Sequence, residues 1–304
     1  MAYSPLWHPG QALGIVAPAS APRAPEKLER GLDALAEDGY RVHWDPGQLA
    51  QRGYLSGSDA ERAAQFHRTL THTRHLIAVR GGYGCLRILD RIDYAAAQRT
   101  PGVLIGYSDI TALQLSLFTC SGWRSISGPV VIEWDSIPAA MKEDVRLLLE
   151  GQLLLPIEGL TTARKGQCTG TLLGGNLSTI ARMVGSRYLP DLEKKLLFIE
   201  DVNEPPYRID ALLTQLKNAG ILERLGGLMI GNFTGDQSQT DQEDGDIMIQ
   251  TILDCVDEYP WPVVSGLEYG HLSSRRVLPI GVSARLSADP NGGCLEILDP
   301  IAKR

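Results

Sequence analysis

A serine at position 108 stands where a predicted strand gives way to a predicted helix. Residues 103–105 are apolar and suit a buried parallel strand, and apolar residues recur at helical spacing from Ile110 onward. Ser108 would then occupy the apex of a sharp turn, beside the free amides of a helix N-terminus, as in a nucleophile elbow. The G-x-S-x-G pattern is incomplete because Ile110 replaces the second glycine. The plain alternative is that Ser108 or Asp109 caps the helix.

A glycine-rich turn at residues 80–84 follows a second predicted strand, residues 75–79. The backbone amides of such a turn can bind an anion. Arg87 occupies the third position of the dinucleotide fingerprint, so that motif is incomplete. We predict that the amides of Gly82 and Asp109 form an oxyanion hole, because hydrolases take one such donor after the nucleophile and another from a different loop. The alternative is an ordinary tight turn between strand and helix.

His271 is the histidine whose surroundings best suit catalysis. It follows Gly270 on a predicted loop after the short strand at residues 262–265, where an imidazole is accessible and can be oriented. Loops favour polar residues in general, so a plain surface histidine is the alternative.

Glu200 ends the apolar strand predicted at residues 196–199. A carboxylate at the carboxyl end of a strand is well placed for an active-site crevice. The alternative is that Glu200 or Asp201 marks the exit of the strand into water. If the candidates converge, their chain order of Ser108, Glu200 and His271 is nucleophile, acid and base, the order found in α/β-hydrolases.

The first half of the chain must position the serine and the glycine turn. Predicted strands alternate there with predicted helices, which indicates a mostly parallel, doubly wound sheet covered on both faces. The pattern weakens over residues 148–165, so we predict an α/β domain over residues 1–155. The strands are predicted at residues 13–17, 40–44, 75–79, 103–105 and 128–131, and the helices at 25–38, 59–71, 85–89 and from 110.

The second half, residues 166–304, is predicted to be a smaller, mixed, β-rich α+β domain that carries Glu200 and His271. Its last part reads as an antiparallel hairpin around a turn rich in Asn and Gly. The predicted strands are residues 196–199, 228–230, 263–264, 282–286 and 295–298, and the predicted helices are 177–184, 206–220 and 244–258.

The composition excludes several classes of protein. A net charge of −7 gives no support to a nucleic-acid-binding surface, and no stretch approaches the length of an apolar membrane span. The first twenty residues contain no Lys or Arg, which argues against a secretory signal. The five cysteines form no C-x-x-C pair, so neither a zinc site nor a disulfide framework is indicated. A cytoplasmic protein without metal or cofactor is expected.

Six short blocks in this order resemble the LD-carboxypeptidases, also called muramoyltetrapeptide carboxypeptidases. The resemblance covers nearly the whole chain and is far more specific than any single block. The blocks are GIVAPAS at residues 14–20, RGGYG at 80–84, GYSD at 106–109, GGNL at 174–177, LFIED at 197–201 with PYR at 206–208, and GH at 270–271.

The resemblance implies a cytoplasmic serine peptidase, often a homodimer, with its site between a doubly wound domain and a smaller β-rich domain. Family roles fall on Ser108 as nucleophile, His271 as general base and Glu200 as the acid that orients it. The implied reaction removes the terminal D-alanine that follows an L-diamino acid in tetrapeptides of recycled peptidoglycan. No metal is required by this chemistry.

Other readings stay open from the sequence. A related branch resembles the microcin C self-immunity peptidases, which cleave peptidyl or aminoacyl nucleotides, and a non-catalytic protein that binds small molecules needs no covalent intermediate. A peptide carboxylate would need a cationic or amide-rich pocket, for which Arg80, Arg275 and Arg276 are candidates.

Overall fold

A computed structural model describes residues 6–45, 51–234 and 241–302, with side chains from 246 onward in the last range. The chain forms two compact units. The first comprises Met1–Gln152, Val277–Gly281 and Pro300–Arg304, and the second comprises Leu153–Arg276 and Val282–Asp299. Among the described residues, no helix combines the length and hydropathy of a membrane span.

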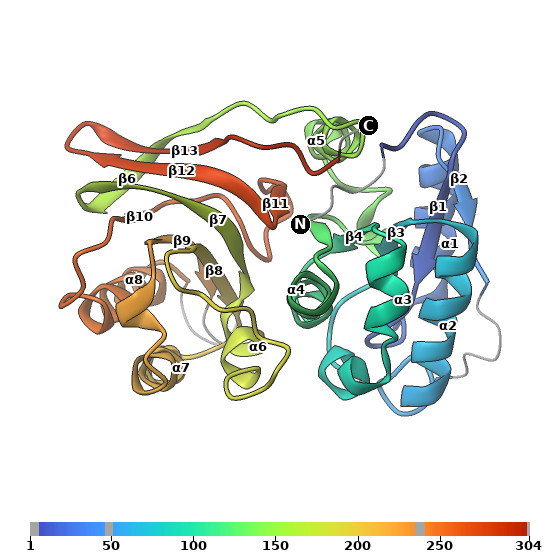
Figure 1. Ribbon diagram of the computed structural model, residues 1–304, viewed down its shortest axis with the longest axis horizontal. Coiled ribbons are helices and arrows are strands. Elements are labelled where there is room, and N and C mark those ends of the chain that lie inside the picture. The colour runs from blue at the N-terminus through green and yellow to red at the C-terminus, as the bar shows by residue number, and fades with distance from the viewer. Residues whose placement is uncertain (1–5, 46–50, 235–240, 303–304) are drawn as a thin grey trace. The chain divides into compact units, whose positions relative to one another are not determined.

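The first unit is built on a six-stranded sheet in the order β11-β5-β4-β3-β1-β2. Figure 1 labels β1, β2, β3, β4 and β11 of this sheet. All neighbouring strands are parallel except β11, which runs antiparallel to β5. Every residue of β3 and β4 is buried, as expected for a sheet covered on both faces. The predicted, mostly parallel sheet is confirmed. The strands are β1 Ala12–Val16, β2 Arg41–His43, β3 His75–Ala78, β4 Val103–Gly106, β5 Arg124–Ser127 and β11 Leu278–Ile280.

The helices of the first unit form two groups of contacts. In the first group, η1 contacts both α2 and α4, and α4 also contacts α3. In the second group, α1 packs on η2. Ser58 begins α2 with a complete capping box, its side chain accepting from the Glu61 amide. The helices are α1 Pro25–Glu37, α2 Asp59–His72, α3 Tyr94–Arg99, α4 Ile110–Ser121 and α5 Ala139–Leu149, with 3₁₀ turns η1 Cys85–Arg91 and η2 Val131–Glu133.

The strand predicted at residues 128–131 is wrong. The strand after α4 is instead β5, whose sequence RSIS is too polar to be recognised as a buried strand. Two hydrogen bonds from distant residues reach this segment: Arg124 donates to the carbonyl of Pro300, and Gln114 donates to the carbonyl of Ile126. The apolar pair at residues 130–131 leads into η2.

The second unit is a closed barrel in the order β10-β6-β13-β12-β7-β8-β9. Strands β7 to β10 are parallel in succession and the remaining pairs are antiparallel, so the predicted mixed, β-rich architecture is confirmed. The strands are β6 Ile157–Arg164, β7 Gly166–Asn176, β8 Leu196–Val202, β9 Gly227–Thr234, β10 Val263–Ser265, β12 Val282–Asp289 and β13 Gly292–Ile297. The helices are α6 Leu177–Arg182, α7 Pro206–Asn218 and α8 Asp241–Cys255, with the 3₁₀ turn η3 Leu222–Arg224.

The segment between the two halves is more regular than its sequence suggests. Strand β6 lies within the stretch that was expected to be a boundary, and its glycine and its mostly exposed or half-exposed residues obscure the strand pattern. The N-terminal part of the first unit ends at Gln152, and the unit also contains Val277–Gly281 and Pro300–Arg304, which the sequence assigned to the second domain. The reason is that β11 pairs with β5 across a large separation in sequence.

Candidate active site

Ser108 adopts a strained backbone conformation between β4 and α4. Its φ of 64° lies in the left-handed region, which non-glycine residues rarely occupy and which is common at active-site turns. Gly106, which precedes it, also has a positive φ, 156°. The capping alternative does not describe Asp109, since its carboxylate oxygen Oδ2 accepts a 2.8 Å hydrogen bond from the amide of Cys85. A serine with a positive φ between a strand and a helix is compatible with a nucleophile elbow, and the nucleophile role of Ser108 stays a prediction.

The glycine turn at residues 80–84 lies directly against this elbow, within the first unit. A methyl group on Gly81 would lie 2.8 Å from Cβ and 3.1 Å from Oγ of Ser108. Gly82 has a φ of 112°, so the turn depends on glycine for its path as well as for its close approach. The structure thus brings together two segments that the sequence analysis assigned to one oxyanion-binding arrangement, although the role of the Gly82 and Asp109 amides stays a prediction.

Arg80 runs alongside the glycine turn. Its guanidinium donates to the carbonyl of Ala21 at 3.2 Å and to that of Gly81 at 3.3 Å. Burial, and secondarily the positive charge of Arg23, lower the pKa of Arg80 from its ordinary value. A cation under these conditions is stabilised by an anion that binds beside it.

Glu200 and His271 form a hydrogen-bonded pair in the second unit. Glu200 lies near the carboxyl end of β8 and is completely buried, while His271 follows β10 on a loop and keeps 22% of its side chain exposed. The distance from Glu200 Oε2 to His271 Nδ1 is 2.7 Å. A buried carboxylate on Nδ1 orients the ring and leaves Nε2 as the nitrogen that can exchange protons.

Gly270 allows this pair to form. Its φ is 133°, and a methyl group there would lie 3.1 Å from both Cβ and Oε2 of Glu200. The Gly270-His271 sequence therefore has a physical reason: the residue before the histidine must be glycine for the backbone to pass so close to the carboxylate.

Asn176 supports Glu200 from the other side, and it was not among the site residues predicted from the sequence. Its Nδ2 lies 3.3 Å from Glu200 Oε1 and 2.8 Å from Asp201 Oδ1, while its Oδ1 accepts from the amide of Thr179 at 3.0 Å. The sequence signal was its place after two glycines in the GGNL block, whereas its position beside the end of the parallel strand β8 is known only from the structure.

Asp201, the neighbour of Glu200, contacts the start of α6 rather than His271. Its Oδ2 accepts from the amide of Ser178 at 2.8 Å, at the N-terminus of α6. Burial raises the pKa of Asp201, and the nearby charge of Glu200 adds to this effect. Of the two adjacent carboxylates, Glu200 is therefore the one that contacts the histidine.

The other two arginine candidates belong to the second unit. Arg275 is only 5% exposed and donates to the carbonyl of Leu272 at 2.8 Å. Arg276 lies 3.7 Å from the carboxylate of Glu268 in an exposed ion pair. Ser108, Gly82, Asp109 and Arg80 thus belong to the first unit, and Glu200, His271, Arg275 and Arg276 belong to the second.

The His271 ring is expected to titrate above its ordinary range. Burial lowers its pKa, but the hydrogen bond and the negative charge of Glu200 outweigh burial, so the pKa is raised above 6.5. The charged pair therefore stabilises the fold fully below pH 6.5, and this contribution is lost as pH rises through the raised pKa. The ring proton resonances followed by NMR from pH 5 to 9, with His271→Gln for assignment, measure the titration. A midpoint below 6.5 would contradict the expectation.

No metal site accompanies these groups in the described part of the chain. No cluster of three or more His, Cys, Asp or Glu residues there has the spacing of a metal site.

Comparison with known proteins defines the class to which this fold and these residues belong. Residues 13–128 match the LD-carboxypeptidase N-terminal domain, and residues 169–286 match the LD-carboxypeptidase C-terminal domain. A probable murein peptide carboxypeptidase from Bacillus subtilis is 32% identical over 94% of this chain and 92% of its own length. The chain therefore belongs to the LD-carboxypeptidase family, and its class is that of a carboxypeptidase, a hydrolase.

Two solved structures have a similar fold. The muramoyltetrapeptide carboxypeptidase from Oxalobacter formigenes superposes with a TM-score of 0.85 at 28% identity, covering 95% of this chain and 99% of that one. The microcin C7 self immunity protein MccF superposes with a TM-score of 0.84 at 22% identity, covering 99% of each chain. The second likeness concerns the fold alone.

Proposed function

We propose that the protein is a serine-type LD-carboxypeptidase that removes the terminal D-alanine from murein tetrapeptides during peptidoglycan recycling. The observation that carries the proposal is the 2.7 Å hydrogen bond between buried Glu200 and His271, in a chain whose Ser108 occupies a strained elbow. The relatives named for murein peptides and for muramoyltetrapeptides support the substrate class.

In the proposed mechanism, Nε2 of His271 takes the proton of Ser108 as Oγ attacks the scissile carbonyl. Glu200 holds the opposite nitrogen and stabilises the imidazolium. The amides of Gly82 and Asp109 stabilise the oxyanion that forms. Collapse breaks the C–N bond, and His271 returns the proton to the departing amine of D-alanine. Water then attacks the acyl-enzyme with the same base, releasing the tripeptide and restoring Ser108.

Arg80 is proposed to bind the carboxylate of the leaving D-alanine. It lies along the glycine turn that contacts Ser108, and its guanidinium donates hydrogen bonds to two backbone carbonyls. A C-terminal carboxylate is only one residue from the bond that a carboxypeptidase cleaves, so its cationic partner must lie close to the nucleophile. Arg276 pairs with Glu268 and Arg275 is largely buried, so both are less available to a substrate carboxylate.

We also propose a cytoplasmic location and a homodimer, which the family resemblance supports. Recycled wall fragments are small soluble peptides, and an acidic chain suits a soluble enzyme that meets them there.

The substrate is tested with two tetrapeptides that differ only in the configuration of the last alanine. The acyl group belongs to an L-residue and the leaving amine to a D-residue, so an L-alanine methyl should misalign the scissile carbonyl. A displacement of about 1 Å can reduce the rate by roughly 10²-fold, and we expect a difference of that order in kcat/KM. Mass spectrometry of the products, with and without EDTA, gives the measurement, and EDTA should have no effect.

The same assay separates the alternatives. An aminoacyl sulfamoyl adenosine serves as a third substrate, and its cleavage in the absence of peptide cleavage would assign the protein to the microcin-immunity branch. Equal cleavage of both diastereomers would contradict the LD specificity. If no compound is cleaved and a serine-directed phosphonate leaves Ser108 unmodified, the protein is a binding protein.

A further inference from the structure

Asp109 carries a carboxylate that the reaction itself does not need. The proposed mechanism uses only its backbone amide, yet the side chain is retained in a nearly buried position, 6% exposed, immediately after Ser108. A negative charge so close to a developing oxyanion opposes catalysis unless other groups hold it. The contacts of the carboxylate therefore indicate what it does.

Those contacts lead to the end of the glycine turn. Asp109 Oδ2 accepts from the amide of Cys85, the first residue of η1, at 2.8 Å. Cys85 is completely buried, and burial together with the Asp109 carboxylate raises the pKa of its thiol well above the ordinary value. The carboxylate thus connects the N-terminus of α4 to the residue that follows Gly84.

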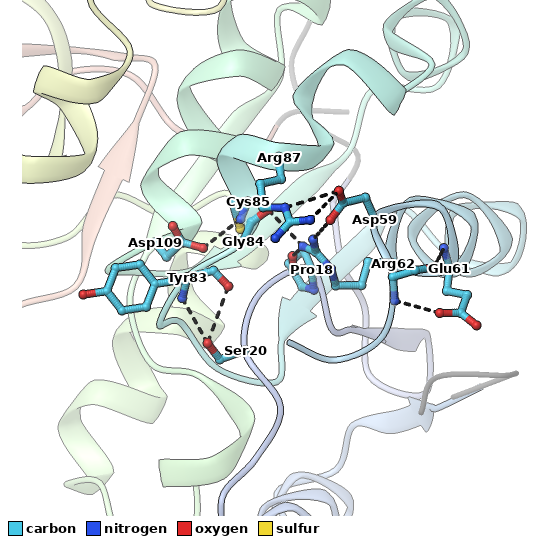
Figure 2. A network of polar contacts seen from close by, with 11 residues as sticks. Pro18, Ser20, Asp59, Glu61, Arg62, Tyr83, Gly84, Cys85, Arg87 and Asp109 are labelled. Carbon is cyan, nitrogen blue, oxygen red and sulfur yellow. Dashed lines mark hydrogen bonds and ion pairs between the residues drawn. The ribbon is translucent and has the colours of Figure 1, made fainter. Parts of the chain in front are cut away.

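Two further groups hold the same turn from other sides (Figure 2). Oγ of Ser20 accepts from the amide of Tyr83 at 3.0 Å. The guanidinium of Arg62, which is fully buried, donates to the carbonyl of Gly84 at 2.9 Å and also to that of Pro18. Asp59 forms an ion pair with Arg62 at the outer end of this network.

We infer that Asp109 is a positioning residue that holds the glycine turn against the elbow and so sets the distance between the two oxyanion donors. Ser20 and Arg62 hold the turn on the side of β1 and α2, and Asp109 holds it on the side of the nucleophile. Gly82 and Gly84 have φ values of 112° and 127° and give the turn little rigidity of their own, so it needs such contacts. Only the expected effect on kcat rests on the proposed function; the positioning of the turn by Asp109 does not.

The test compares Asp109→Ala and Asp109→Asn with the wild type. Alanine keeps the backbone amide but removes the contact to Cys85, and we expect kcat for the D-alanine tetrapeptide to fall about 10²-fold with KM changed by less than about threefold. Asparagine keeps one oxygen acceptor and should recover at least about tenfold of that loss. A purely electrostatic role predicts the opposite sign, because removal of a negative charge near the oxyanion would raise kcat.

Hydrogen exchange gives a second readout that does not depend on activity. In Asp109→Ala, peptides that cover residues 80–86 should exchange faster, while those of β1 and β5 should be unchanged. Asp93→Ala is the matched control, since Asp93 also accepts a 2.8 Å bond from a backbone amide, that of Ala96, at the start of α3. This control should lower Tm without changing either kcat or exchange in the turn.

The outcomes separate the inference from the proposed function. A wild type that cleaves no tetrapeptide refutes the proposed function, and hydrogen exchange then still decides whether Asp109 holds the turn. A folded Asp109→Ala variant with wild-type kcat and wild-type exchange overturns the inference. If that variant does not fold, Ser20→Ala removes the contact to Tyr83 instead and must show the same loss of kcat and the same local exchange.

Discussion

Ser108→Ala is expected to fold as the wild type does and to lose turnover of the D-alanine tetrapeptide by about 10⁴-fold or more. Loss of Oγ removes the atom that forms the covalent bond, and the remaining groups of a triad cannot compensate because they act as a unit. The strained φ of 64° is kept by alanine, so the backbone of the elbow should not change. Steady-state kinetics on pure protein gives the measurement.

The control for this variant is a buried serine elsewhere in the same unit. Ser121 lies at the end of α4, where its Oγ donates to the carbonyl of Tyr94 at 3.0 Å. Ser121→Ala should lose some stability and keep its activity. A phosphonate should modify Ser108 in the wild type and in this control, as peptide mapping would show. Activity close to that of the wild type in Ser108→Ala would refute the nucleophile assignment.

Glu200→Gln is expected to keep the fold and to reduce kcat by roughly 10³- to 10⁴-fold. The amide can donate to Nδ1 of His271, which would hold the wrong tautomer, and it cannot stabilise the imidazolium. The pKa of His271 should also fall below its wild-type value, because burial lowers it and the opposing charge of Glu200 has been removed. Kinetics and NMR titration of the ring measure the two effects independently.

Asp201→Asn is the matched control for this change, one residue along the same strand. Asp201 accepts from the amide of Ser178 and contacts Asn176, so its loss should affect stability more than kcat. If Asp201→Asn proves to be the crippling change and Glu200→Gln the mild one, the acid of the triad has been assigned to the wrong neighbour.

Much of the first unit could be predicted because its signals are local. The alternation of short apolar strands with amphipathic helices indicated a parallel sheet, and the strand predicted at residues 103–105, which is β4, was recognised from its composition. Strand β5 could not be recognised in the same way, since its sequence RSIS is polar and its burial depends on partners such as Pro300 at the far end of the chain. A strand cannot be recognised from the hydrophobic pattern of its own sequence when a distant segment of the chain supplies the hydrogen bonds that allow it to be buried.

The candidate site also combines features that local sequence predicts with features that depend on distant partners. The sequence predicted that Ser108, Glu200 and His271 lie at strand ends or on loops. They were chosen as candidates because functional side chains tend to lie at such places. The support from Asn176 was not visible, since its amide reaches Glu200 only because β7 and β8 are parallel neighbours. The role inferred for the Asp109 side chain likewise needed the position of Cys85, which is distant in sequence.

The sequence by itself determined the family, the fold class and the residue types available for chemistry, since these follow from periodicity, turn composition and the order of short blocks. Only the tertiary structure decided that Glu200 rather than Asp201 contacts His271, that Gly81 packs on Ser108, and that β11 joins the first unit. The physical reason is that these contacts join residues far apart in the chain. Local propensity carries no information about which distant partner satisfies a buried polar group or fits beside a glycine.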